Sequence, residues 1–317
     1  MAKAKTQRKS SDKASASTRA GFHSLLVPID FTPISDRVLS RLSLLPLADG
    51  ARVTLLHVVP ESLPAREQRN AEQDASKALA EEAKHLRTLL PRQVRIEPWV
   101  KRGSAVREIA AAATRLNTDL IVMGRAGRRA LRDAFIGSTA ERVIRQARLP
   151  VLAVRLAARA AYRRPALALD LDPTAHDVVR LMLAVLPTPL PWVEVIHAID
   201  FPYGRVSYPS LPEDQVQRLK SELRSNATRQ LEKLLATALA KASVRAREQP
   251  FWKTHVQCGS PRIVVEKLVK KMDTDLLVLG TRAYSGAAYV LLGTVAGDLL
   301  RAARCDVLIV PPSRPHA

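Results

Sequence analysis

Five residues that suit a phosphate-binding loop lie close together around position 130. They follow the pattern G-x2-G-x9-G-S-T, formed by Gly124, Gly127, Gly137, Ser138 and Thr139. Glycine lets a backbone approach an anion closely because it has no Cβ atom. If Gly137 precedes a helix, the free amides and the helix dipole favour a phosphate, and the hydroxyls of Ser138 and Thr139 add donors. An ordinary loop followed by a helix cap would also use these residues, so both interpretations stay open.

Arginines surround this pattern and are expected to raise the local positive potential. They are Arg125, Arg128, Arg129 and Arg132. Neither a Walker lysine motif nor G-x-G-x-x-G is present, so the loop differs from the phosphate loops of those folds.

A carboxylate is expected at the same end of the sheet. Asp30 ends the apolar run 25–30. In open α/β sheets, ligands bind beyond the carboxyl ends of the strands, where the strand order reverses. A carboxylate there can accept hydrogen bonds from ribose hydroxyls. Capping of the next helix by Asp30 or Thr32 explains the residue equally well.

The pattern of apolar residues predicts the elements that hold these side chains. Buried parallel strands are expected at 25–30, 52–59, 94–101, 119–124 and 151–154, and helices at 34–48, 65–90, 104–116 and 138–147. Strands that alternate with helices indicate βαβ units and a parallel sheet. The second half is expected to repeat this, with strands near 166–171, 192–199, 251–257, 275–280 and 306–310 and its longest helix at 213–241.

The sequence contains an internal repeat. An offset of 140 places 24–33 on 164–173 and 53–60 on 193–200, so that His57 falls on His197. An offset of 156 places 100–124 on 256–280 and 147–154 on 303–310. Constant offsets over several blocks predict two copies of one unit. The change of offset marks an insertion rich in Pro and Tyr at 201–212.

These features together resemble the universal stress protein family. The resemblance rests on VPIDFT with Asp30, LLHV at 55–58, TDLIVMG at 118–124 and the glycine pattern after it. It covers about 24–154 and 166–310, as in the tandem, E-type members. It implies two doubly wound five-stranded α/β units with strand order 3-2-1-4-5, the adenine nucleotide alpha hydrolase-like fold. It also implies that the units pair through their last strands, 151–154 and 306–310.

The expected domain organisation follows from this resemblance. We expect a disordered basic tail at 1–21, a first domain at 22–156, a linker at 157–165 and a second domain at 166–312. These domains are called the first and second halves below.

The resemblance also implies an adenine-nucleotide site in the first half. Pro28, Ile29 and Asp30 would meet the base and ribose, and Val58 would line the adenine slot. Met123, Gly124, Gly127, Gly137, Ser138 and Thr139 would hold the ribose and phosphates of ATP, with or without Mg²⁺. His57 is expected to be a packed structural histidine rather than a catalyst.

The second half keeps this pattern only in part. Asp170, Gly280, Gly293 and Thr294 match, whereas Ala283 stands where the first half has Gly127. Either the second site is remodelled for another ligand, or it is a pseudo-site kept for packing.

Composition limits the cellular context and the partners. The 317 residues carry a formal net charge of +20, and six lysines and arginines of the tail face one acid, Asp12. The tail is expected to bind polyanions weakly and without specificity, or to be solvated without a partner. No run approaches the roughly 20 apolar residues that span a bilayer. The two cysteines, Cys258 and Cys305, fit a reducing cytoplasm.

The leading functional hypothesis is a cytoplasmic, ATP-binding stress-response protein in which the nucleotide biases conformation or partner binding. One alternative is an ATP-hydrolysing or adenylating enzyme on the same fold. Another is a nucleotide-independent scaffold for nucleic acid or a lipid-like ligand. No nucleophile–base pair and no metal cluster are evident, so at most slow ATP hydrolysis is expected. A pseudo-dimeric monomer and a homodimer of tandem chains both remain open.

Overall fold

The computed structural model describes residues 21–125, 139–172, 174–200, 212–242, 249–281 and 292–312. The first half contains β1 (Phe22–Pro28), α1 (Pro33–Leu42), β2 (Leu47–Val59), α2 (Ala65–Leu89), β3 (Arg95–Arg102), α3 (Ala105–Arg115), β4 (Leu120–Gly124), α4 (Thr139–Ala147) and β5 (Val151–Val154). The second contains β6 (Pro165–Ala168), α5 (Ala175–Val185), β7 (Val193–Ile199), α6 (Glu213–Lys241), β8 (Trp252–Cys258), α7 (Pro261–Lys271), β9 (Leu276–Gly280), α8 (Thr294–Ala302) and β10 (Asp306–Val310).

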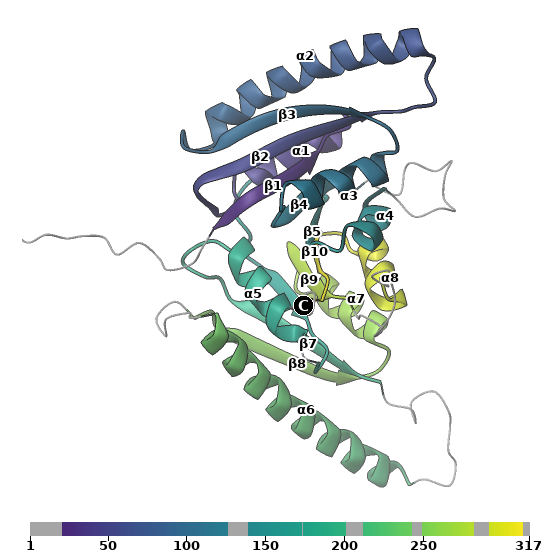
Figure 1. Ribbon diagram of the computed structural model, residues 1–317. Helices are drawn as coiled ribbons and strands as arrows, with labels where there is room; N and C mark the ends of the chain where they lie inside the picture. The colour runs from purple at the N-terminus through teal and green to yellow at the C-terminus, as the bar shows by residue number, and fades with distance from the viewer. Residues whose placement is uncertain are drawn as a thin grey trace, which may run out of the picture.

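All these strands belong to one continuous sheet (Figure 1). Its order is β3-β2-β1-β4-β5-β10-β9-β6-β7-β8. Within each half the paired strands are parallel, whereas β5 and β10 run antiparallel, with Leu152 opposite Leu308. The predicted α/β class is confirmed, and the two five-stranded units are joined into a ten-stranded sheet through their last strands.

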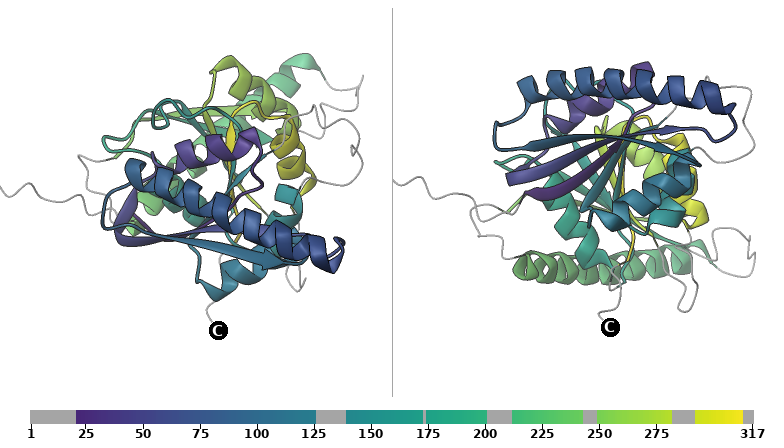
Figure 2. Two further views of the ribbon diagram at one scale, coloured as in Figure 1. Left: turned by 90° about the horizontal axis from the view of Figure 1, so that it is seen from above. Right: turned by 45° about the horizontal axis from the view of Figure 1, so that its top comes forward.

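Helices cover both faces of the sheet. One hydrophobic cluster contains side chains of α1, α2, α5 and α6, and the other contains those of α3, α4, α7 and α8. The central strands β4, β5, β9 and β10 are buried on both faces, which explains their nearly continuous apolar sequences. The longest helices, α2 and α6, lie at opposite ends of the sheet (Figure 2). In the described part of the chain, no helix combines the length and apolar character needed to cross a bilayer.

One aspartate in each half fixes the start of the fourth strand beside the first. The Asp119 carboxylate accepts hydrogen bonds from the backbone N–H groups of His23 and Ser24, at 2.7 and 2.9 Å. In the second half, Asp275 accepts the backbone N–H groups of Arg163 and Arg164, at 2.7 and 3.0 Å. These contacts explain the repeated Thr-Asp-Leu sequence as a structural feature.

Some element boundaries differ from those expected. The first strand ends at Pro28, so Asp30 lies two residues beyond it rather than at its end. The apolar run extends past the end of the strand because Ile29 is buried as well. The longest helix of the second half runs from Glu213 to Lys241, as predicted. The predictions for the tail and for 201–211 fall outside the described residues.

Candidate functional site

The sheet of the first half reverses its strand order between β1 and β4. β1 pairs with β2 on one side and with β4 on the other. Leu25 and Leu26 lie opposite Leu120 and Ile121, and both strands continue beyond this pairing, β1 to Pro28 and β4 to Gly124. The carboxyl ends of these strands therefore bring Pro28, Ile29, Val58, Met123 and Gly124 to one edge, which is the usual ligand position in such sheets.

Asp30 is held at this edge through one of its two carboxylate oxygens. Its Oδ1 accepts hydrogen bonds from Thr32 N at 3.0 Å, Thr32 Oγ1 at 2.7 Å and Ser35 Oγ at 2.9 Å. Desolvation of the carboxyl would raise its pKa, but the hydrogen bonds from Thr32 and Ser35 outweigh that effect and lower the pKa of Asp30. Within the described part of the chain, Oδ2 has no hydrogen-bond donor. The residue is thus an ionised, oriented acceptor with one oxygen available.

His57 supports the backbone next to Asp30. Its Nδ1 donates a hydrogen bond to the carbonyl oxygen of Ile29 at 2.8 Å, and the ring of Phe31 lies 4.6 Å from its own. His197 makes the equivalent bond to the Leu169 carbonyl at 2.9 Å. A contact repeated in both halves agrees with the structural role expected for His57.

Gly124 is required for packing of α1 on the end of β4. A Cβ atom at this position would lie 2.8 Å from both Cγ1 and Cγ2 of Ile34. Gly280 has the same relation to α5, with Val178 Cγ2 at 3.0 Å. Helix packing alone therefore accounts for glycine at both places, without a phosphate.

Arg125 does not contribute to the positive potential at this edge in the way expected from the sequence. Its guanidinium donates to the carbonyl oxygens of Leu300, Arg301 and Ala303, at the C-terminus of α8 in the second half. The side chain is 5% exposed, and burial, followed by the charge of Arg155, lowers the pKa of the guanidinium to about 10. It remains protonated at neutral pH and caps the helix as a cation. This role was missed because the bonded carbonyls lie about 175 residues away.

The glycine pattern is described only at its two ends. Gly127, Gly137 and Ser138, together with the other three arginines of the loop, lie outside the described residues. Thr139 is the exposed first residue of α4.

The second half places its matching residues at the opposite edge of the sheet but surrounds them differently. Asp170 lies two residues beyond β6, and its Oδ1 accepts the backbone N–H of Leu171 at 3.0 Å. At the positions of Thr32 and Ser35 the second half has Asp172 and Ala175. The hydroxyls of Thr32 and Ser35 thus have no counterpart at these two positions. Gly293 precedes α8 and Thr294 begins it, and Ala283 lies outside the described residues.

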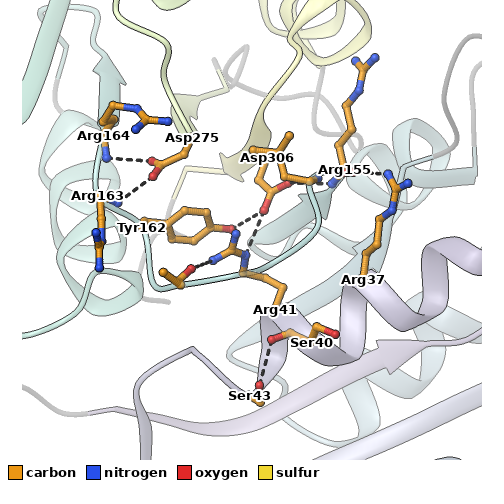
Figure 3. A network of polar contacts seen from close by, with 12 residues as sticks. Arg37, Ser40, Arg41, Ser43, Arg155, Tyr162, Arg163, Arg164, Asp275 and Asp306 are labelled. Carbon is orange, nitrogen blue, oxygen red and sulfur yellow. Dashed lines mark hydrogen bonds and ion pairs between the residues drawn. The ribbon is translucent and has the colours of Figure 1, made fainter.

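A buried polar network joins the two halves beside the first-half edge (Figure 3). Asp306, which is fully buried, accepts from Arg41 Nε at 3.1 Å and from the Tyr162 hydroxyl at 2.8 Å. The backbone N–H groups of Arg155 and Leu156 donate to its other oxygen at 2.7 and 2.8 Å. This network is hard to predict from the sequence, because Tyr162 belongs to the linker and Asp306 stands where the first half has Pro150.

His255 and Cys258 lie three residues apart on β8. His255 Nε2 lies 2.6 Å from Glu194 Oε2 on the neighbouring strand. No group of three or more potential metal-ligating His, Cys, Asp or Glu side chains occurs among the residues described.

Comparisons with known proteins agree with this architecture. The universal stress protein family model matches residues 21–155 and again residues 161–311. Universal stress protein A homolog 1 of Coxiella burnetii is 28% identical over 152 residues, 47% of this chain and 96% of the relative. Universal stress protein E of Escherichia coli is 33% identical over 61 residues, only 19% of either chain.

A solved universal stress protein from Archaeoglobus fulgidus shares the fold over nearly the whole chain. Its TM-score is 0.64 at 16% identity, and the likeness covers 91% of this chain and 98% of that one. Because the family model matches both halves separately, this chain belongs to the universal stress protein family as a tandem, two-domain member.

Proposed function

We propose that the first half binds ATP, and that the protein acts as a nucleotide-binding member of its family in the stress response. The observation that carries this proposal is the state of Asp30. Its carboxylate is ionised, fixed through Oδ1 and has no described donor to Oδ2, at the edge where the strand order reverses. Such an oxygen can accept hydrogen bonds from the hydroxyl groups of a ribose.

The residues around Asp30 are proposed to bind the base and the phosphates of the nucleotide. Pro28, Ile29 and Val58 offer apolar and backbone surface for the base next to Asp30. Met123 and Gly124 lie at the end of β4, and Gly127, Gly137, Ser138 and Thr139 would follow the phosphates to the start of α4. The amides and the dipole of that helix favour an anion. Mg²⁺ would accompany the phosphates rather than have protein ligands of its own.

The second half is proposed to be a diverged site. Asp170, Gly280, Gly293 and Thr294 retain the positions of a nucleotide site. However, Asp172 and Ala175 replace Thr32 and Ser35, and Ala283 replaces Gly127 of the glycine pattern. One ATP per chain is therefore expected.

The same proposal gives the nucleotide a regulatory rather than a chemical task. Arg125, directly after Gly124, contacts α8 of the other half, so ATP at this edge is positioned to bias the arrangement of the two halves or the binding of a partner. The described cysteines, Cys258 and Cys305, are free thiols. We place the protein in the reducing cytoplasm on this ground.

Calorimetric titration of ATP with Mg²⁺ tests the proposal with an internal control. Wild-type protein should bind one ATP, and Asp30→Asn should weaken binding about tenfold or more, since a hydrogen bond to a charged group contributes about 1.5–3 kcal/mol. Asp170→Asn, the same change in the other half, should leave the affinity unchanged. No binding to wild type would refute the nucleotide site. Undiminished binding to Asp30→Asn would refute the role of Asp30, and two ATP per chain would refute the single site.

A further inference from the structure

The edge strand β3 has one face that α2 does not cover. Ile96 and Val100 point to the cluster that contains α2, and the alternation of a strand turns Trp99 and Lys101 to the opposite face. The helix on that side, α3, packs mainly against β1, β2 and α4 (Figure 1). This face of β3 is therefore only partly covered: Arg95 is exposed, whereas Trp99 and Lys101 are half-buried, with Trp99 packed against the margin of the cluster that contains α3.

Four cations lie along this partly covered face, three on β2 and β3 and one, Arg115, at the end of α3. Arg52 and Arg95 are exposed and lie opposite one another in the register of β2 and β3. Further along β3, Lys101 Nζ lies 5.6 Å and the Arg115 guanidinium 5.3 Å from the centre of the Trp99 ring. We name Arg52, Arg95, Lys101 and Arg115 together the basic face.

The basic face lacks counter-ions in the described part of the chain. None of its four cations forms an ion pair there, although Glu97 occupies the same side of β3. Nearby arginines outside the face do have partners, since Arg102 pairs with Glu72 and Arg107 with Glu61. Like charges directly opposite on paired strands are destabilising. Arg52 and Arg95 therefore gain most from an anion supplied by another molecule.

The internal repeat shows that the fold does not require this charge. At the positions of Arg52 and Arg95, the second half has Trp192 and Phe251, whose exposed rings stack with centres 5.4 Å apart. In place of Trp99 it has His255, which is paired with Glu194. The two ends of the sheet thus share the same backbone, but one exposes arginines where the other exposes aromatic rings.

We propose that the basic face binds single-stranded nucleic acid through its phosphates, with Trp99 beside the bases. β3 spans about 26 Å at ~3.3 Å per residue, so its flat side offers an extended chain several successive contacts. A cationic track with an adjacent aromatic side chain is the usual basis of sequence-tolerant single-strand binding. No described helix projects from this face to enter the major groove of a duplex. The net charge of +20 favours a polyanion over an acidic patch on one protein.

Fluorescence anisotropy with a labelled 20-nucleotide oligo-dT tests this on the full chain. Arg115→Glu should weaken binding at least tenfold. The association constant should also become less sensitive to salt: the negative slope of log K against log salt should become shallower by about 0.7 or more for each phosphate contact that is lost. Lys271→Glu is the matched control, because it makes the same charge change at the equivalent position of the second half. It should change affinity less than twofold. Oligo-dT should also quench tryptophan emission in wild type, and Trp99→Phe should remove that change.

Several outcomes would overturn the proposal. Equal weakening by Arg115→Glu and Lys271→Glu would assign binding to net charge or to the N-terminal tail. Tighter binding of a 20-base-pair duplex would assign the surface to double-stranded DNA. Equal affinity for polyphosphate or polyglutamate, without a change in Trp99 emission, would make it a general polyanion surface. None of these outcomes depends on whether ATP binds the first half.

Discussion

Three aspartates of this protein have different structural roles, and each role follows from the hydrogen-bond donors around the carboxylate. Asp30 is oriented by neighbouring hydroxyls, Asp119 by the backbone of the adjacent strand, and Asp306 by Arg41 and Tyr162. The donors of Asp30 lie within five residues of it, so its local contacts are accessible to sequence reasoning, although it lies two residues beyond the strand rather than at its end. The importance of Asp306 could not be predicted, because Arg41 is 265 residues away.

Disruption of the network around Asp306 should lower the free energy of unfolding strongly. Asp306→Asn leaves the charge of Arg41, whose side chain is 4% exposed, buried without its partner. Breaking such a pair costs about 3–5 kcal/mol of unfolding free energy. Tyr162→Phe, which removes one hydrogen bond to the Asp306 carboxylate, should cost about 1.5–3 kcal/mol of unfolding free energy. Urea unfolding measures both.

An exposed ion pair provides the comparison. Arg164 and Asp273 have side chains that are 56% and 89% exposed, so Asp273→Asn should cost about 0–1 kcal/mol. If Asp306→Asn costs no more than Asp273→Asn, burial does not determine the strength of the network.

At the scale of elements, periodicity located the strands and helices better than their ends. The apolar run 25–30 predicted β1, yet the paired strand is Phe22–Pro28. Ile29 stays buried after pairing with β4 has stopped, and Phe31 then turns the chain with a φ of 57°. Hydrophobicity reports burial, whereas strand bounds depend on hydrogen bonds to neighbours distant in sequence. The same reason explains why the role of Gly124 could not be predicted: it packs against Ile34, which is distant from it in the sequence.

Gly124→Ala should destabilise the protein by steric overlap. The new Cβ would lie 2.8 Å from two carbons of Ile34, and such overpacking typically costs about 1–3 kcal/mol. Gly293→Ala meets nothing within 4 Å and should cost less than about 1 kcal/mol, the loss of a glycine N-cap. Thermal unfolding compares the two. Addition of Ile34→Ala should make the effect of Gly124→Ala smaller, and a purely additive double variant would refute this packing explanation.

The whole molecule is a repeat that is symmetric in its backbone and asymmetric at its junction. Both halves contribute one strand to the β5–β10 pairing, as the family resemblance implied. The charged side chains at that junction, however, belong to one edge. Arg125, Arg155 and Asp306 correspond to Thr281, Pro311 and Pro150 at the other edge. The repeat predicted the pairing of the halves, but the asymmetry appears only when the repeats are compared position by position in three dimensions.

This asymmetry predicts that Arg125 stabilises α8 across the junction. Arg125→Thr introduces the residue of the second half and removes the donors to three carbonyls at the end of α8, leaving no buried charge behind. We expect the local stability of α8 to fall by about 1.5–3 kcal/mol, the contribution of hydrogen bonds to a charged group. Amide exchange in the last turns of α8 should therefore be at least ~10-fold faster than in wild type. Arg304→Thr is the matched control, because Arg304 follows the same helix, carries the same charge and is exposed. Equal exchange in the two variants would mean that Arg125 acts only through net charge. Faster exchange confined to Arg125→Thr would instead mean that Arg125, a residue of the first half, sets the local stability of α8 in the second half.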